Sequence, residues 1–353
     1  IAIAMSESFK LGPPKENPRS LFLKSQLRTS VQWPPAVTDL EGQVAIVTGS
    51  SSGLGLEASR QLLSIGLSSL IIAVRSIEKG QHVASGLRVQ YPKASIQVWS
   101  LEMESYESIQ AFARRAEAEL SRLDIAILNA GTQALEFITV PSTGHEKLVQ
   151  VNYLSTMLLG ILLLPILKSK SPSGKPGRLT IVNSGTARGA TLSLPKDTPI
   201  LPALDDKSGS FDIFGRYAVS KLLGHLFVIN LVRYVSADDV IVNLADPGLV
   251  NGTDLQRGAP LFWAAFFYFL KAILGRTVGV GASTYIDAAV FKGKESHGCY
   301  IPNWKISSFP AFIYTPEGES VREQLWKETM AEFEFAGAQR LLDGLKEQVI
   351  AKS

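Results

Sequence analysis

Between about residues 43 and 305, short apolar runs rich in β-forming residues alternate with longer helical stretches. The short runs are expected to be strands over 44–49, 70–74, 95–100, 125–131, 179–184, 240–248 and, more weakly, 298–301. Helices are expected over 105–122, through 145–168 and from about 217. Strands bracketed by helices at this spacing indicate βαβ units, and their continuously apolar character is typical of strands buried on both faces. The pattern predicts an α/β fold, namely a Rossmann-type doubly wound parallel sheet of about seven strands with helices on both faces.

The two ends of the chain depart from this alternation. Residues 1–40 hold prolines at 13, 14, 18, 34 and 35 and show little periodicity, which is typical of an arm and not of a domain. Residues 317–350 carry charges at i, i+4 spacing and predict a pair of surface helices. We therefore expect an N-terminal arm over 1–40 and a single domain over 41–353.

A doubly wound sheet binds its ligand beyond the carboxyl ends of its strands, so the residues after each strand are the ones to inspect. The first strand is followed by TGSSSGLG at 48–55, a T-G-x-x-x-G-x-G pattern. Gly49 would allow a tight turn, Gly53 the close approach of a pyrophosphate, and Gly55 close packing of helix on strand. The phosphates would then lie at a helix N-terminus, where free N–H groups and the helix dipole favour anions.

Three further strand ends carry residues that suit a dinucleotide. The second strand ends in Arg75, where an NAD enzyme usually has a carboxylate; an arginine suits the 2′-phosphate of NADP, and a solvated surface arginine is the alternative. Glu102 follows the third strand and could accept a hydrogen bond from the adenine amino group. Asn129, Ala130 and Gly131 follow the fourth strand, and their small size would let a ribose approach.

The segment GRYAVSKLLG at 215–224 places Tyr217 and Lys221 four residues apart. On a helix these two side chains lie on one face, one turn apart. A partly buried tyrosine covered by the stem of a lysine would explain the pair structurally. A phenol activated by an ammonium group would explain it functionally.

These motifs together resemble one family. TGSSSGLG, Asn129-Ala130-Gly131, Tyr217-Ala-Val-Ser-Lys221 and Asp246-Pro247-Gly248 occur in the order found in the short-chain dehydrogenases/reductases, and the resemblance covers roughly residues 41 to 305. The AVR…KG turn (Arg75, Lys79, Gly80), the SKLL run and the long insert before the tyrosine resemble the retinol-dehydrogenase-like branch, which includes fungal reductases of natural-product pathways. The resemblance therefore implies an oxidoreductase, with secondary metabolism as its setting.

The resemblance also implies a set of site residues. Tyr217 would be the general acid/base, Lys221 its partner, Ser184 the residue that polarises the substrate carbonyl, and Asn152 the residue that holds a water against the lysine. Thr253 would contact the carboxamide or a phosphate, although PGLVNGT is one residue longer than the usual spacing, and Glu102 stands where the family more often has Asp. The expected contacts of NADP(H) are Gly49, Ser51, Ser52, Gly53, Leu54, Gly55, Arg75, Glu102, Asn129, Ala130, Gly131, Tyr217, Lys221, Pro247, Gly248, Val250 and Thr253.

The chemistry of carbonyl reduction needs these residue types. A hydride added to the carbon makes charge build on the oxygen, where a hydrogen-bond donor stabilises it and a proton must follow. A free phenol has a pKa of about 10, and a neighbouring ammonium together with the positive nicotinamide ring is expected to lower that pKa. The cofactor supplies the hydride.

Composition excludes several other classes of function. The net charge is +3 and no block of five like charges occurs, so no basic face for nucleic acid is expected. Four scattered histidines and the single Cys299 form no ligand cluster, and we expect no metal site. The chain shows no signal-peptide pattern, and no apolar run reaches the roughly 18 residues that span a bilayer. We expect a cytoplasmic protein with no spanning segment. A homodimer is possible.

Two apolar stretches have alternative explanations. LLGILLLPIL at 158–167 is expected to be a buried or subunit-facing helix, bent near Pro165. GAPLFWAAFFYFLKAILG at 258–275 follows the Pro-Gly turn, where the family places its substrate lid, at about 250–280. This second stretch is apolar on most sides, so it must be buried or cover something. A lid over a hydrophobic substrate, a patch on a membrane surface and a subunit contact all remain open.

The sequence thus predicts an NADP(H)-dependent carbonyl reductase or alcohol dehydrogenase that acts on a lipophilic small molecule. An enzyme with the same fold and cofactor that runs net-neutral chemistry, such as isomerisation or epimerisation, is the first alternative. A nucleotide-sensing binding protein with a vestigial site is the second. The presence of all four residues Asn152, Ser184, Tyr217 and Lys221 argues against the latter.

Overall fold

A computed structural model describes residues 6–33, 38–195, 198–208, 212–252 and 269–352 of the chain. Seven parallel strands form one sheet in the order β3-β2-β1-β4-β5-β6-β7. Their bounds are β1 Val44–Thr48, β2 Ser69–Val74, β3 Ser95–Ser100, β4 Ile125–Leu128, β5 Gly177–Val182, β6 Val240–Asp246 and β7 Cys299–Pro302. The predicted doubly wound α/β sheet is confirmed, and the order reverses between β1 and β4, where such sheets bind their ligands.

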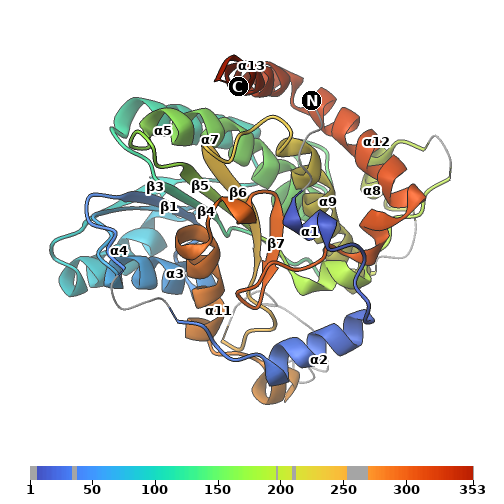
Figure 1. Cartoon of the computed structure of the whole chain (residues 1–353), viewed down its shortest axis with the longest axis horizontal. Helices are drawn as coiled ribbons and strands as arrows, with labels where there is room; N and C mark the ends of the chain where they lie inside the picture. Colours follow the sequence, from blue (N-terminus) through green and yellow to red (C-terminus); the bar gives the residue numbers. More distant parts are fainter. Residues whose placement is uncertain (1–5, 34–37, 196–197, 209–211, 253–268, 353) are drawn as a thin grey trace.

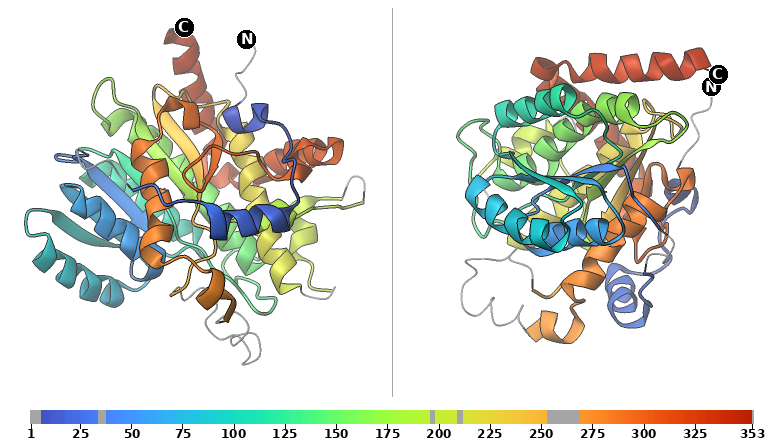
Figure 2. Two further views of the ribbon diagram at one scale, coloured as in Figure 1. Left: turned by 60° about the horizontal axis from the view of Figure 1, so that its bottom comes forward. Right: turned by 90° about the vertical axis from the view of Figure 1, so that its left-hand side faces the viewer.

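Helices cover both faces of the sheet, as the right-hand view of Figure 2 shows. One face carries α3 (Gly53–Ser64), α4 (Ile77–Gln90) and α11 (Val278–Ile286). The other carries α5 (Tyr106–Glu119), α7 (Thr156–Lys170) and α9 (Ile213–Leu231), with α12 (Pro316–Glu332) and α13 (Ala338–Lys352) packed outside them. The shorter elements are α6 Lys147–Val149, α8 Ile200–Asp205, η1 Gln150–Ser155, η2 Gly185–Gly189, η3 Asp287–Phe291, η4 Lys294–Ser296, η5 Ala311–Tyr314 and η6 Glu334–Ala336.

The apolar run 158–167 lies inside α7 and belongs to the core. Eight of its ten residues are buried, the exceptions being Leu162 and Pro165, and α5 and α13 pack against the helix. Within the described ranges, Lys147–Lys170 is the one continuous helix long and apolar enough to cross a membrane, and 89% of its most apolar window is buried inside the protein. Burial within this chain accounts for its composition.

The N-terminal arm contains two helices, α1 (Glu7–Lys10) and α2 (Pro18–Arg28). The side chain of Asn17 accepts a hydrogen bond from the Ser20 amide at 2.9 Å, and Pro18 occupies the first helical position. An asparagine cap followed by proline is a helix start signal, so the sequence held evidence for α2 that the proline count obscured. Figure 1 shows α2 lying across the lower edge of the domain.

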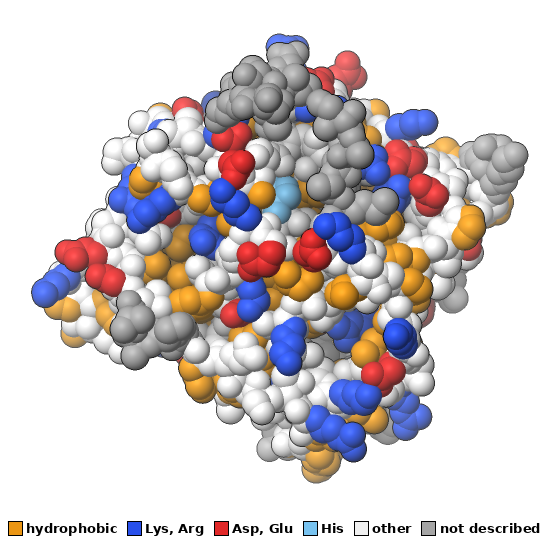
Figure 3. Space-filling model, viewed as in Figure 1, with side chains coloured by type: hydrophobic (Ala, Val, Ile, Leu, Met, Phe, Trp, Pro, Cys, Tyr) orange, Lys and Arg blue, Asp and Glu red, His pale blue; other side chains and the backbone are white. Residues whose placement is uncertain are grey.

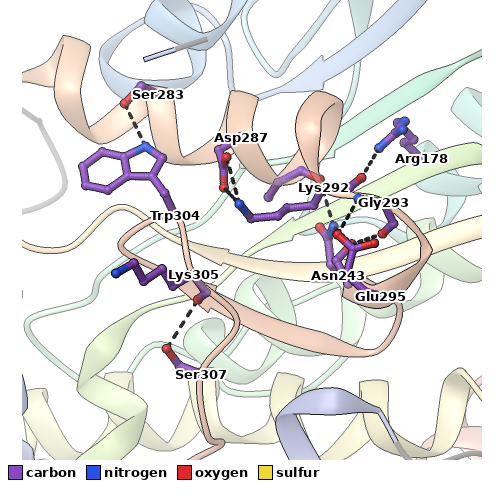
Figure 4. A network of polar contacts seen from close by, with 12 residues as sticks. Arg178, Asn243, Ser283, Asp287, Lys292, Gly293, Glu295, Trp304, Lys305 and Ser307 are labelled. Carbon is purple, nitrogen blue, oxygen red and sulfur yellow. Dashed lines mark hydrogen bonds and ion pairs between the residues drawn. The ribbon is translucent and has the colours of Figure 1, made fainter. Parts of the chain in front are cut away.

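A polar network, drawn in Figure 4, ties the edge of the sheet at β7 to the helices beside it. Lys292 forms an ion pair with Asp287 at 3.0 Å, and its carbonyl accepts a hydrogen bond from Arg178 of β5 at 2.6 Å. Just after β7, Asn303 and Trp304 have left-handed backbone angles (φ 55° and 59°), and the Trp304 indole donates to Ser283 of α11 at 3.2 Å. The turn after β7 is therefore held in an uncommon conformation by buried contacts.

Candidate active site

A cleft of about 1320 Å³ lies at the carboxyl ends of the strands. Every residue expected to contact the cofactor or to act in catalysis lines this cleft, with two exceptions. Gly55 lies behind the wall, and Thr253 falls outside the described residues, as does most of the apolar segment 258–275. The fold thus brings to one place side chains and glycines that are spread along the chain from Pro18 to Tyr285.

The glycine-rich turn between β1 and α3 is closely packed and depends on glycine at fixed positions. Gly49 (φ +66°) and Gly53 (φ +56°) use left-handed backbone angles that favour glycine. A Cβ on Gly49 would lie 3.0 Å from the Ala130 backbone, and one on Gly55 would lie 2.6 Å from the Gly49 carbonyl oxygen. The Ser52 side chain makes no capping hydrogen bond, so the first amides of α3 keep their capacity to bind an anion.

The end of β4 is fastened to this turn. The Asn129 side-chain amide donates to the carbonyl of Thr48 at 2.9 Å and to that of Gly49 at 3.3 Å. The Ala130 amide in turn donates to the Thr48 hydroxyl at 2.9 Å. These bonds hold the two loops together across the switch point of the sheet, which fixes the cleft at the place where a ribose would pass.

Arg75 lies at the far end of the cleft from Tyr217 along the sheet, after β2. Its guanidinium is 3.7 Å from the carboxylates of both Glu102 and Glu104, and its side chain is 71% exposed. Lys79 and His82 of α4 line the same part of the cleft. The sequence drew attention to Arg75 and Glu102 but not to His82 or Glu104, whose roles depend on how α4 and the β3–α5 loop fold back.

Ser184 and Tyr217 meet on the opposite wall. Ser184 caps η2 and accepts from the Thr186 amide at 3.3 Å and from the Thr186 hydroxyl at 3.0 Å. The Ser184 hydroxyl also acts on the Tyr217 phenol, whose pKa it lowers as a hydrogen-bonding neighbour. Both side chains reach the cleft, so a carbonyl oxygen placed between them would receive two hydrogen bonds. Thr186, which the sequence did not single out, orients the serine.

Lys221 and Asn152 lie behind the tyrosine. The Lys221 ammonium is 6.0 Å from the centre of the Tyr217 ring and donates to the Val182 carbonyl at 3.1 Å. The Asn152 side chain accepts from the Thr132 amide at 2.8 Å and donates to the Thr132 carbonyl at 2.9 Å. Asn152 lies on the π-helical turn η1, a feature common at functional sites, which opens the helix where the asparagine turns toward Gly131.

Burial dominates the ionisation of Tyr217 and Lys221. Desolvation raises the pKa of Tyr217 to about 12, and the hydrogen bond from Ser184 opposes that rise. Desolvation lowers the pKa of Lys221 to about 8, and the negative charge of Asp246 opposes that shift. In the protein without a bound cofactor, burial thus sets the direction of the Tyr217 shift, and the expected lowering by the ammonium and the nicotinamide ring stays a prediction for the complex.

Asp246 is a buried carboxylate at the end of β6 with no role assigned from the sequence. It accepts a hydrogen bond from the Tyr300 hydroxyl at 2.6 Å and from the Gly248 amide at 2.9 Å. Its position next to the Pro-Gly turn brings a fixed negative charge to the floor of the cleft. Only the pairing of β6 with β7 places Tyr300 beside it, which is why the sequence alone did not reveal the contact.

The Pro-Gly turn forms the last part of the wall. Gly248 has a φ of +73°, and a Cβ there would lie 2.5 Å from the Gln26 side-chain oxygen. Val250 is buried and packs against Gly281 of α11. In the parts of the chain that the structure describes, three or more His, Cys, Asp or Glu side chains nowhere gather in a geometry that could hold a metal ion. The arrangement suits a dinucleotide and an organic substrate.

Comparison with known proteins agrees with this arrangement. The family model for short chain dehydrogenases matches residues 43–193. The chain is 52% identical to the short chain dehydrogenase/reductase mfmJ of Annulohypoxylon moriforme over 92% of its length and 94% of that relative, and 45% identical to the short chain dehydrogenase virL of Hypocrea virens, with the same coverage. A short chain dehydrogenase of Shigella flexneri, solved in complex with NADP, superposes with a TM-score of 0.54 at 21% identity, over 75% of this chain and 98% of that one. The chain belongs to the short-chain dehydrogenase/reductase family.

Proposed function

We propose that this protein is an NADP(H)-dependent oxidoreductase that reduces a carbonyl group, or oxidises the corresponding alcohol, on a lipophilic small molecule of secondary metabolism. The observation that carries the proposal is the placement of Ser184 and Tyr217 on one wall of the cleft, with Lys221 behind them. Two donors directed at one point suit an oxygen on which negative charge develops.

The residues present fit a phosphorylated nicotinamide cofactor. The uncapped amides at the start of α3 would bind the pyrophosphate, and Asn129 to Gly131 would lie along a ribose. Arg75 and Lys79 would hold the 2′-phosphate, in place of the carboxylate that accepts a 2′-hydroxyl in NAD enzymes. The NADP in the Shigella flexneri relative supports the same choice. When bound, the cofactor would supply or accept the hydride.

Residues of the chain itself would supply the proton that the carbonyl oxygen takes up. With a pKa of about 12, Tyr217 is a neutral phenol near pH 7 and donates to the carbonyl oxygen, while the Ser184 hydroxyl provides a second hydrogen bond. Lys221 lies close enough to stabilise the phenolate that remains after the proton has left. A phenol held neutral favours reduction, whereas oxidation needs the phenolate at the start.

The apolar part of the wall supports a lipophilic substrate. Phe22, Phe214, Leu249 and Leu270 line the cleft together with the catalytic residues. Such a mixture of apolar walls and a few directed polar groups is typical of sites for small organic molecules.

The test is a screen of NADPH oxidation with alkyl phenyl ketones from acetophenone to decanophenone. The proposal expects alcohol to form in amounts equal to the NADPH consumed, and expects Tyr217→Phe to abolish both. Product formed without net consumption of NADPH would favour isomerisation or epimerisation instead. Failure to bind NADPH, measured by fluorescence titration, would overturn the cofactor assignment.

A further inference from the structure

We propose that helix α2 of the N-terminal arm is a wall of the substrate pocket and that Phe22 sets the length of apolar substrate that fits. The inference rests on the function proposed above and names a specificity-determining residue within it. The arm lies before the stretch matched by the family model, which begins at residue 43. Its participation in the cleft therefore comes from the structure of this chain.

One face of α2 lines the cleft. The residues that do so are Pro18, Phe22, Ser25 and Gln26. Their spacing of i, i+4, i+7 and i+8 is the spacing of a single stripe along an α-helix. Leu23 and Leu27, which point elsewhere, are 37% and 60% exposed. The helix thus presents Phe22 inward, while Arg19, Lys24 and Arg28 are exposed, and Figure 3 shows Lys and Arg side chains gathered over this part of the surface.

Gln26 holds α2 to both sides of the segment that follows β6. Its side-chain nitrogen donates to the carbonyls of Leu249 at 2.9 Å and Leu274 at 2.8 Å, and its oxygen accepts from the Leu249 amide at 3.2 Å. One side chain therefore satisfies three backbone groups that are distant in sequence. Gly248, whose missing side chain leaves room for the Gln26 oxygen, makes this close approach possible.

Arg276 also holds the C-terminal end of α2, where Gln26 lies. Its guanidinium donates to the Ser25 carbonyl at 2.8 Å and to the Pro247 carbonyl at 3.1 Å, and it bonds to Asn303. It also lies 5.1 Å from the centre of the buried Trp304 ring. The Ser25 hydroxyl donates to Asn303 at 2.6 Å, so the left-handed turn after β7 serves to direct Asn303 at the arm.

The other end of α2 lies against η2, the turn that begins just after the catalytic Ser184. A Cβ on Gly189 would be 3.9 Å from the Cβ of Pro18. α2 thus runs from the serine loop to the Pro-Gly turn, and the left-hand view of Figure 2 shows it crossing the front of the molecule. With both ends fixed, Phe22 lies between them on the cleft side, where the apolar part of a substrate would rest.

The placement of α2 can be tested without any substrate. Cβ atoms 3.9 Å apart suit a disulfide, so oxidation of the Pro18→Cys/Gly189→Cys variant should link residues 18 and 189, detected by mass spectrometry of peptides. The native Cys299 is buried and should not compete. The control is Leu27→Cys/Gly189→Cys, which should not form this bond. Absence of the 18–189 link would overturn the proposal even if the enzyme proved to be an active reductase.

The role of Phe22 is tested by kinetics with the alkyl phenyl ketones. Phe22→Ala should raise KM by about tenfold for decanophenone, with a loss that declines as the alkyl chain shortens, because the lost contact is apolar. Leu27→Ala, on the exposed face of the same helix, should leave KM unchanged, and NADPH affinity should be unaltered in both. An equal change for all ketones, or an equal effect of Leu27→Ala, would overturn the assignment. An enzyme that forms the 18–189 link but oxidises no NADPH would refute the proposed function alone.

Discussion

The two ends of the cleft differ in whether backbone or side chains form the wall. At the glycine-rich end, the wall is mainly backbone: the turn at 48–55, the start of α3 and the loop after β4. At the tyrosine end, the wall is mainly side chains, which arrive from η2, α9, the Pro-Gly turn and α2. A backbone site needs glycine at fixed spacing along one stretch of chain. A side-chain site needs only that the fold bring distant segments together.

This difference predicts that substitutions at the two ends will damage different steps. Changes at the glycine-rich end should weaken cofactor binding or folding, because the backbone itself must keep its path. Changes at the tyrosine end should reduce turnover or substrate binding and spare the cofactor. The substitutions below, with their controls, begin with the one expected to have the largest effect.

Tyr217→Phe should lower kcat by about 100-fold or more, since it removes the proton donor and leaves the ring in place. NADPH affinity, measured by fluorescence titration, should change little, because the hydroxyl faces the Ser184 side of the cleft. If the variant kept more than about a tenth of the kcat of the unmodified enzyme, another residue would have to donate the proton.

Gly55→Ala tests the glycine-rich end. The new Cβ would lie 2.5 Å from the Asn129 side-chain nitrogen and 2.6 Å from the Gly49 carbonyl oxygen, so both loops would have to move. We expect the free energy of unfolding to fall by about 1–3 kcal/mol and NADPH affinity to fall with it. Gly86→Ala is the matched control.

Gly86 lies in the helix α4, and a Cβ there would meet no atom within 4 Å. Gly86→Ala should therefore leave cofactor affinity unchanged and stabilise the protein by about 0.5–1 kcal/mol in chemical denaturation. Equal behaviour of the two alanine variants would mean that the turn has more room than its contacts indicate.

Arg75→Ala tests the choice of cofactor. Loss of an exposed guanidinium should weaken NADPH binding by about tenfold and NADH binding much less, because only NADPH carries the 2′-phosphate. Arg60→Ala, which removes an exposed arginine of α3 outside the cleft, is the control. Equal weakening of both cofactors in Arg75→Ala would mean that the phosphate is recognised elsewhere, and Lys79 would be the next residue to test.

Much of the fold and of the glycine-rich end could be predicted from the sequence. The seven strands appear as continuously apolar runs because both of their faces are buried, and their ends fall within a few residues of the expected positions. Gly49, Gly53 and Gly55 could be found because each meets a local backbone requirement. Ser184, Tyr217 and Lys221 could be placed through the order of the motifs, although their functional roles stay predictions.

The contacts that escaped prediction all depend on tertiary structure. Nothing near Phe22 in the sequence indicates that its helix would face a cleft whose other lining residues, outside α2, begin at Gly49. The Asp246–Tyr300 contact needs the parallel pairing of β6 with β7. In the sequence, 52 residues lie between Asp246 at the end of β6 and Cys299 at the start of β7. The full burial of Tyr217, which raises its pKa, could not be predicted either, because burial depends on the whole fold and not on the spacing of Tyr217 and Lys221 along one helix.

The smallest expected effect is a change in how stability depends on pH, and it concerns Lys221. Its pKa is lowered from the ordinary value of 10.5 to about 8, so below pH 8 the folded and unfolded states both carry the proton and the folded state bears a poorly hydrated charge. Between pH 8 and 10.5 the unfolded state binds more protons than the folded state, and stability contributed by this group rises with pH. Lys221→Met removes the titration and leaves an unbranched side chain that is one atom shorter. Its stability relative to the unmodified protein should be most favourable below pH 8 and should decline steadily toward pH 10, measured by urea denaturation at several pH values. Tyr217, whose pKa is raised from the ordinary value of 10 to about 12 in the folded state, also adds a pH dependence near pH 10, but it is present in both proteins and its contribution is therefore subtracted in the comparison. A stability difference independent of pH would show that the Lys221 ammonium is better compensated by the Asp246 charge and the Val182 carbonyl than its burial indicates.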